Sequence, residues 1–208
     1  MNPSNDPLGD ARGGCYEWLC SDDVITPAGG IRGYTAASPP LSSPDTPAPR
    51  AGFEYPEAAA LWLSWACWRQ SRGEPTPASP VRRRVAERLL NDLVSGEGLG
   101  KSERVYLFDS VLGIHALACH LRSQGDGARR APVVDAAKRI LKRFRDADAV
   151  VLPRIDDLPG ARWSQRWGPY QLRAAGFLAI CVRLLEEPSL QAEVDWLTLR
   201  AAMSQATT

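Results

Sequence analysis

The clearest pattern in this sequence is an alternation between two kinds of apolar segment, which begins at about residue 55. Prolines and glycines separate the segments, and these residues favour loops over helix interiors. The pattern predicts six helices, at about 56–70, 80–95, 103–123, 131–146, 169–187 and 190–206. The first, third and fifth are apolar on nearly every face, which is typical of helices buried on all sides, and the other three are amphipathic. The sequence therefore predicts an all-α fold.

The amphipathic segments are expected to cover the apolar ones. In the second predicted helix, apolar residues recur every four positions on one face, and charged side chains occupy the opposite face. Short loops make successive helices antiparallel, so each apolar helix forms a hairpin with the amphipathic helix after it. We expect these hairpins to stack side by side with the apolar helices in an inner layer. They span about 55–98, 99–147 and 163–208.

The three apolar segments also align with one another without gaps. When Glu57 is set against Asp109 and Gln171, one cysteine from each segment falls at the same position. This agreement favours a repeated hairpin unit. The aligned cysteines are Cys67, Cys119 and Cys181.

Residues 1–54 have a different character. Eight of the 17 prolines lie in residues 1–49, and the stretch 36–50 is rich in proline, serine and alanine. A proline inside a helix removes a backbone donor and clashes with the preceding turn. We therefore expect an irregular segment with a proline-rich linker, in which Gly14–Leu19 adds at most one helical turn, followed by one helical domain at 55–208.

Charge and cysteine content narrow the classes of partner. The chain has 25 Lys and Arg against 24 Asp and Glu, and this near-balance argues against a dedicated nucleic-acid binder, which normally carries an excess of basic residues. It contains no uninterrupted apolar run of about 18 residues and no secretory signal pattern. Five scattered cysteines fit reduced thiols better than a disulfide framework. With its strong preference for arginine over lysine, the composition favours a cytoplasmic protein of bacterial origin, with no nucleic-acid or membrane partner.

Four motifs resemble those of α/α-toroid proteins. They are GGIRGY (29–34), FEYPEAAALWL (53–63), VYLFDSVLGIHAL (105–117) and WSQRWGPYQLRAA (163–175). The superfamily includes six-hairpin glycosidases, uronyl epimerases, polysaccharide lyases and terpenoid-cyclase-like toroids. The resemblance implies a partial α/α toroid, because a full six-hairpin ring at about 50–60 residues per hairpin needs roughly twice this length. A homo-oligomer that completes such a ring is left open.

Glu57 and Asp109 are the candidate catalytic residues. Parallel inner helices would bring their N-termini to one rim, and glycoside hydrolysis uses two carboxylates, one as acid and one as base or nucleophile. The alternative is structural, since an acidic residue in a first helical turn also complements the helix dipole. Asp109 lies several residues beyond Ser102, the expected N-cap, so we expect it to face the inner surface.

Several neighbouring residues are candidates for substrate binding. Arginine offers a planar set of donors for a hydroxyl or carboxylate, and exposed tryptophans beside arginine can stack on a sugar ring. The alternative is that the tryptophans attach a loop to the domain, while Trp62, Trp65 and Trp68 are more typical of a core. The candidate binding residues are Tyr55, Trp163, Arg166, Trp167, Tyr170 and Arg173.

No cofactor or metal motif is complete. The Cys119-His120 pair resembles that of the lanthionine-cyclase toroids, but Leu121 stands where those enzymes have glycine. No Cys-x-x-Cys spacing, P-loop or dinucleotide fingerprint occurs. We expect buried, unreactive cysteines, a core histidine at His115 and no cofactor. Metal binding by Cys67, Cys119 and His120 is left open.

Two hypotheses of different class follow for the function. The first is a glycan-active or glycan-binding protein that uses the carboxylate-containing rim on an oligosaccharide. The second is a non-catalytic helical-repeat module that binds a protein or peptide along its inner surface. Short length favours the module, and the resemblance favours the enzyme-like protein.

Overall fold

The computed structural model describes residues 7–32, 54–95, 97–101, 104–153 and 167–204. Within these residues the chain forms helices and one small sheet, so the all-α expectation is confirmed for most of the fold. The helices are α1 (Pro7–Leu19), α2 (Pro56–Ser71), α3 (Ser79–Ser95), α4 (Leu107–Gln124), η1 (Gly127–Arg129), α5 (Arg130–Asp146), α6 (Gln171–Leu184), η3 (Pro188–Leu190) and α7 (Gln191–Met203). None of them is long and apolar enough to cross a membrane.

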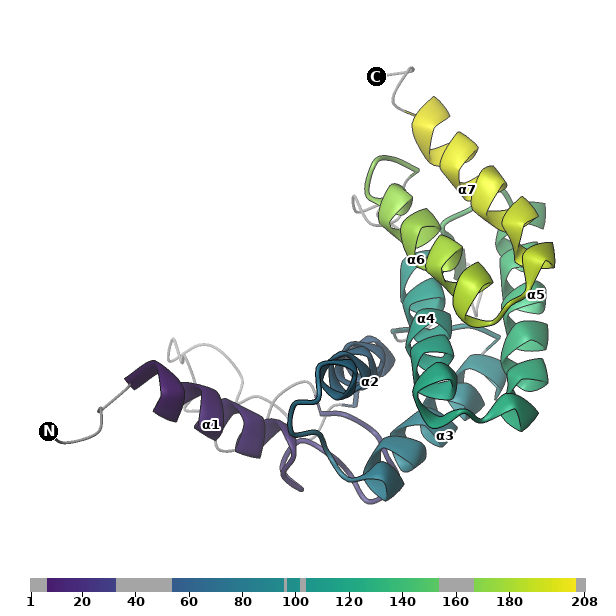
Figure 1. The fold of residues 1–208 in the computed structure, drawn as a ribbon. Coiled ribbons are helices and arrows are strands. Elements are labelled where there is room, and N and C mark those ends of the chain that lie inside the picture. Colours follow the sequence, from purple (N-terminus) through teal and green to yellow (C-terminus); the bar gives the residue numbers. More distant parts are fainter. Residues whose placement is uncertain (1–6, 33–53, 96, 102–103, 154–166, 205–208) are drawn as a thin grey trace, which may run out of the picture.

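The helices pack in pairs, as the alternation predicted. Helix α2 packs against α4, and α4 packs against α6, so these three form an inner row. Helices α3, α5 and α7 follow them in the chain and lie on the outer side of the row (Figure 1). The toroid implied by the sequence resemblance stays a prediction.

Helix α4 lies at the centre because it is apolar all round. Its residues from Leu107 to Leu121 are almost all buried, whereas α5 buries one face only. On α5 the buried face carries Ile140, Leu141 and Phe144, and full burial of such a side chain contributes about 1.5–3 kcal/mol. The contrast confirms the predicted difference between the apolar and amphipathic segments.

A three-stranded antiparallel sheet was not predicted. It consists of β1 (Gly100–Lys101), β2 (Arg104–Tyr106) and β3 (Val151–Pro153), with β2 in the middle. The predicted helix start at residue 103 was therefore four residues too early, because α4 begins at Leu107. Val105 is buried in the sheet opposite Leu152, a pairing between residues far apart in the sequence that no local pattern reveals.

The N-terminal segment is more helical than expected. Helix α1 has 13 residues, whereas the sequence predicted one turn at most. The cost of Gly13 and Gly14, about 1 kcal/mol each relative to alanine, is offset by contacts with α2. The Trp62 indole donates to the carbonyl of Leu19 at 2.8 Å, and the Arg69 guanidinium stacks over the ring of Tyr16. The proline-rich stretch 36–50 lies outside the described residues.

Candidate functional site

Three of the predicted site residues meet at the N-terminal ends of α2 and α4. Tyr55 is the residue before α2, and Glu57 lies in the first turn of that helix. The Tyr55 hydroxyl donates a hydrogen bond to Asp109 Oδ2 of α4 at 3.1 Å. The negative charge of Glu57 acts on both Tyr55 and Asp109. We call these three residues, together with Tyr170, the carboxylate rim.

Tyr170 brings the start of α6 to the same rim. It stands immediately before Gln171, the first residue of the helix, so the helix begins two residues later than the sequence predicted and Pro169 lies in the preceding turn. Burial, together with the charges of Glu57 and Asp109, raises the pKa of the Tyr170 phenol. Of the side chains expected at one rim, these four interact with one another.

The glycine pair of the GGIRGY motif helps to hold Tyr55 in place. The Tyr55 backbone N–H donates to the carbonyl of Ile31, a buried residue just after the two glycines. Gly29 has φ +85°, and a Cβ atom there would lie 2.5 Å from the backbone oxygen of Arg84 on α3. Only glycine allows the loop to approach α3 this closely without strain.

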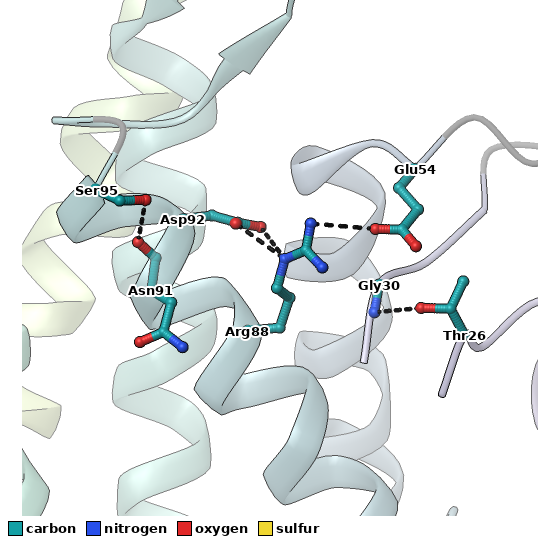
Figure 2. Close-up of polar contacts among 7 residues, drawn as sticks. All are labelled: Thr26, Gly30, Glu54, Arg88, Asn91, Asp92 and Ser95. Atoms are coloured by element: carbon teal, nitrogen blue, oxygen red, sulfur yellow. Dashed lines mark hydrogen bonds and ion pairs between the residues drawn. The ribbon is translucent and has the colours of Figure 1, made fainter. Parts of the chain in front are cut away.

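An ion-pair cluster fixes the residue before Tyr55. Figure 2 shows the Arg88 guanidinium between Glu54 and Asp92. Arg88 Nη2 lies 3.2 Å from Glu54 Oε2. Arg88 Nε donates to Asp92 Oδ1 at 2.9 Å and to Asp92 Oδ2 at 3.1 Å. Next to Glu54, the Gly30 backbone N–H donates to the Thr26 hydroxyl (Figure 2). The loop and α3 thus both help to position the start of α2.

Asp109 occupies an unusual electrostatic environment. Asp109 is only 6% exposed, although it lies in the first turn of α4, where side chains are often exposed. The expected position well inside the helix was wrong, because Tyr106 and not Ser102 precedes the first turn. Burial and the Glu57 charge raise the pKa of Asp109 to about 7, against the opposing effect of the Tyr55 hydrogen bond. Burial therefore outweighs the favourable helix N-terminus.

An aromatic and cationic wall adjoins the carboxylate rim. The rings of Phe108 and Tyr170 lie 4.7 Å apart, and Phe177 packs against the edge of Phe108. The Arg173 guanidinium is 5.8 Å from the Phe108 ring and 5.9 Å from the Tyr170 ring. Arg173 is exposed, so its donors can reach a ligand at the rim.

Trp167 packs against other parts of the protein and is not an exposed stacking surface. Its indole N–H donates to the carbonyl of Asp148 at 3.0 Å, and its ring packs edge-on against Trp196. Arg200 stacks over the same ring and pairs with the Asp148 carboxylate. These contacts attach the segment before α6 to α7. The other two candidates in this loop, Trp163 and Arg166, lie outside the described residues.

The tryptophans of α2 divide between core and surface. Trp62 is buried, as predicted, and Trp65 is half-buried. The prediction was wrong for Trp68, which is 53% exposed and lines a groove with His115 of α4. From the sequence, both Trp68 and His115 were assigned to the core, because each lies on a helix that is apolar on nearly every face. Neither was therefore identified as a groove residue.

The cysteines are free, and two of the three aligned ones are buried as predicted. These are Cys67 and Cys181, while Cys119 is half-buried and lies with its Sγ 3.6 Å from His115 Nε2. Burial raises the pKa of the Cys119 thiol to about 11, so it is protonated at neutral pH. Across the described residues, no group of three or more His, Cys, Asp or Glu side chains could hold a metal ion.

Comparisons with protein-family models, with curated proteins and with solved structures give no match for this chain.

Proposed function

We propose that the carboxylate rim is an acid–base site that acts on a glycan. One observation carries the proposal: Asp109 is a buried carboxyl with a pKa of about 7, next to a second carboxylate, Glu57. A general acid works best when its pKa lies near the working pH. Two neighbouring carboxyl groups in different environments are the arrangement that glycoside hydrolysis requires.

The two carboxyl groups would take different roles. Protonated Asp109 would donate its proton to the glycosidic oxygen as the bond to the sugar breaks. Glu57, which is only half-buried, would act in one of two ways. As a base it would take a proton from the water that attacks the anomeric carbon. As a nucleophile it would bond to that carbon itself, and water would then hydrolyse the resulting glycosyl ester. The Tyr55 hydroxyl would orient the Asp109 carboxyl through its hydrogen bond.

The side chains of the adjoining wall suit the binding of a sugar, and of an acidic sugar in particular. Aromatic faces such as those of Phe108 and Tyr170 can pack against the C–H groups of a sugar ring. Exposed Arg173 can bind a carboxylate or hydroxyls with its planar set of donors. The sequence resemblance to glycan-active toroids points to the same substrate class.

The test uses a panel of acidic and neutral oligosaccharides with the full chain. Saturable thermal stabilisation identifies the sugar class that binds, and chromatography of the products measures turnover. We expect Asp109→Asn and Glu57→Gln each to lower turnover by about 10²–10⁴-fold while binding and folding persist. Asp135→Asn, which changes an exposed carboxylate on α5, is the matched control and should keep full turnover. Unchanged turnover in Asp109→Asn, or no stabilisation by any sugar, would contradict the proposal.

The alternative function is a non-catalytic module for a protein or peptide partner. Its specific support is that Leu61 and Trp68 on α2 are each 53% exposed, which is unusual for a helix of an inner row. Under this alternative, Glu57→Gln and Asp109→Asn would leave partner binding unchanged. Partner capture that fails with Trp68→Ala but survives both carboxylate changes would favour the module.

A further inference from the structure

A groove runs along the inner row at the opposite end from the carboxylate rim. It has a volume of about 760 Å³ and lies between the C-terminal halves of α2 and α4, with Leu184 from the end of α6. Pockets that bind small molecules have volumes of about 300–1,000 Å³. The groove is therefore large enough to hold a small molecule of several rings.

One part of the groove has an apolar wall that includes two tryptophan rings. Trp65 and Trp68 of α2 face the groove, together with Cys119 of α4. Trp68 is 53% exposed, and the flat guanidinium of Arg72 already lies over its ring, 5.2 Å from the centroid. The indole is therefore a surface on which a flat group stacks. Burial lowers the pKa of His115, a further wall residue, so it is neutral at pH 7 and adds no charge to this part.

The last turns of α2 and α4 give the groove a polar end with positive charge. Among the described residues, no acidic one lines the groove. The Arg122 side chain there is 69% exposed, and its ion pair with Glu186 is long, at 4.0 Å. Gln70, also in the wall, accepts a hydrogen bond from Nη1 of Arg82. Arg82 is only 6% exposed, its Nε has no hydrogen-bond partner, and it makes no ion pair within the part of the chain that the structure describes.

These charges determine the sign of a complementary ligand. The C-terminal end of a helix carries about half a negative charge, and its effect fades within the last turn. Arg122 carries a full positive charge in the groove wall. Arg82 does not line the groove itself but donates to the wall residue Gln70, and its buried charge is costly unless an anion compensates it. The positive charge outweighs the helix ends, so an anionic group fits the polar end.

We infer that the groove binds a small, flat aromatic carboxylic acid. The rings stack against Trp68 and Trp65 in the apolar part, and the carboxylate lies at the polar end near Arg122. This ligand site is separate from the carboxylate rim, and it does not depend on the proposed glycan activity.

The test measures binding of anthracene-9-carboxylate to the full chain by its fluorescence and by calorimetry. The neutral isostere anthracene-9-carboxamide is the ligand control. We expect Trp68→Ala to weaken binding of both compounds by tenfold or more, since the stacking surface is lost. Arg122→Gln should weaken binding of the carboxylate about fivefold or more and leave the carboxamide unchanged. Matched controls on the outer helices are Leu199→Ala and Arg139→Gln, both exposed, which should bind like the unchanged chain.

Three results would overturn the inference. The first is the absence of saturable binding. The second is equal affinity for carboxylate and carboxamide, with no effect of Arg122→Gln, which would remove the anionic part of the ligand class. The third is competition for the groove by a copurified peptide that requires Trp68, which would assign it to a protein partner.

Discussion

Four effects compete at Asp109, and their balance gives the rim its chemistry. Burial and the neighbouring Glu57 charge favour the neutral carboxylic acid. The Tyr55 hydrogen bond and the N-terminal end of α4 favour the carboxylate. Burial and the Glu57 charge outweigh the other two effects, so Asp109 changes its charge near neutral pH. The sequence put Asp109 several residues beyond the helix start, whereas it lies in the first turn of α4, and its burial depends on how α2, α4 and α6 pack.

The same balance predicts how stability depends on pH. The folded protein holds the Asp109 proton up to about pH 7, whereas an unfolded chain releases it near the ordinary value of 3.8. Stability from this group therefore falls as pH rises from about 4 to 7 and then levels off. Asp109→Asn removes the effect, so the variant should gain stability relative to the unchanged chain by on the order of 2–3 kcal/mol between pH 5 and pH 8.5.

Urea unfolding at the two pH values measures that gain. Asp135→Asn provides the reference for an exposed carboxylate, and its stability should follow that of the unchanged chain. Parallel pH dependence in Asp109→Asn and the unchanged chain would show that Asp109 titrates as an ordinary exposed acid.

Among the elements, the long periodic helices were predictable and the short or tertiary-determined ones were not. The alternation of apolar and amphipathic segments located α2 to α7 within a few residues. Strand β2 lies next to a strongly helical segment, and its partner β3 comes from residues 151–153, far away in the sequence. Helix α1 was underestimated because its support comes from Trp62 and Arg69 on α2.

The glycine loop before α2 gives an element-scale prediction. Gly29→Ala should cost about 2–4 kcal/mol of stability, because the new Cβ would meet the backbone of Arg84 at φ +85°. Gly30→Ala should cost only about 1 kcal/mol. Its Cβ would lie 2.2 Å from the end of the Glu54 side chain, which can rotate away at the expense of its contact with Arg88.

Urea unfolding of the two variants gives the comparison, with Gly176→Ala as the control. Gly176 is on α6 with nothing near its missing Cβ, so alanine there should be neutral or stabilising by about 0.5–1 kcal/mol. If Gly29→Ala proved no more costly than Gly30→Ala, the close approach of this loop to α3 would be contradicted.

At the scale of the whole molecule, the two ends of the inner helices carry two different kinds of surface. Their N-terminal ends gather Glu57 and Asp109, and their C-terminal ends form the groove with Trp68 and Arg122. The hairpin pattern was enough to predict that acidic residues would share one rim. The groove was not predictable, because exposure of Trp68 follows from the way the inner row packs.

The most direct test of the central claim is the titration of Asp109 itself. The carboxyl ¹³C shift of Asp109, followed by NMR across pH 3–9, reports its ionisation in the full chain. We predict a midpoint near 7, a lower midpoint in Glu57→Gln and a higher one in Tyr55→Phe, since these changes remove the raising charge and the lowering hydrogen bond. A midpoint near the ordinary value of 3.8, unaffected by either substitution, would contradict the acid–base site.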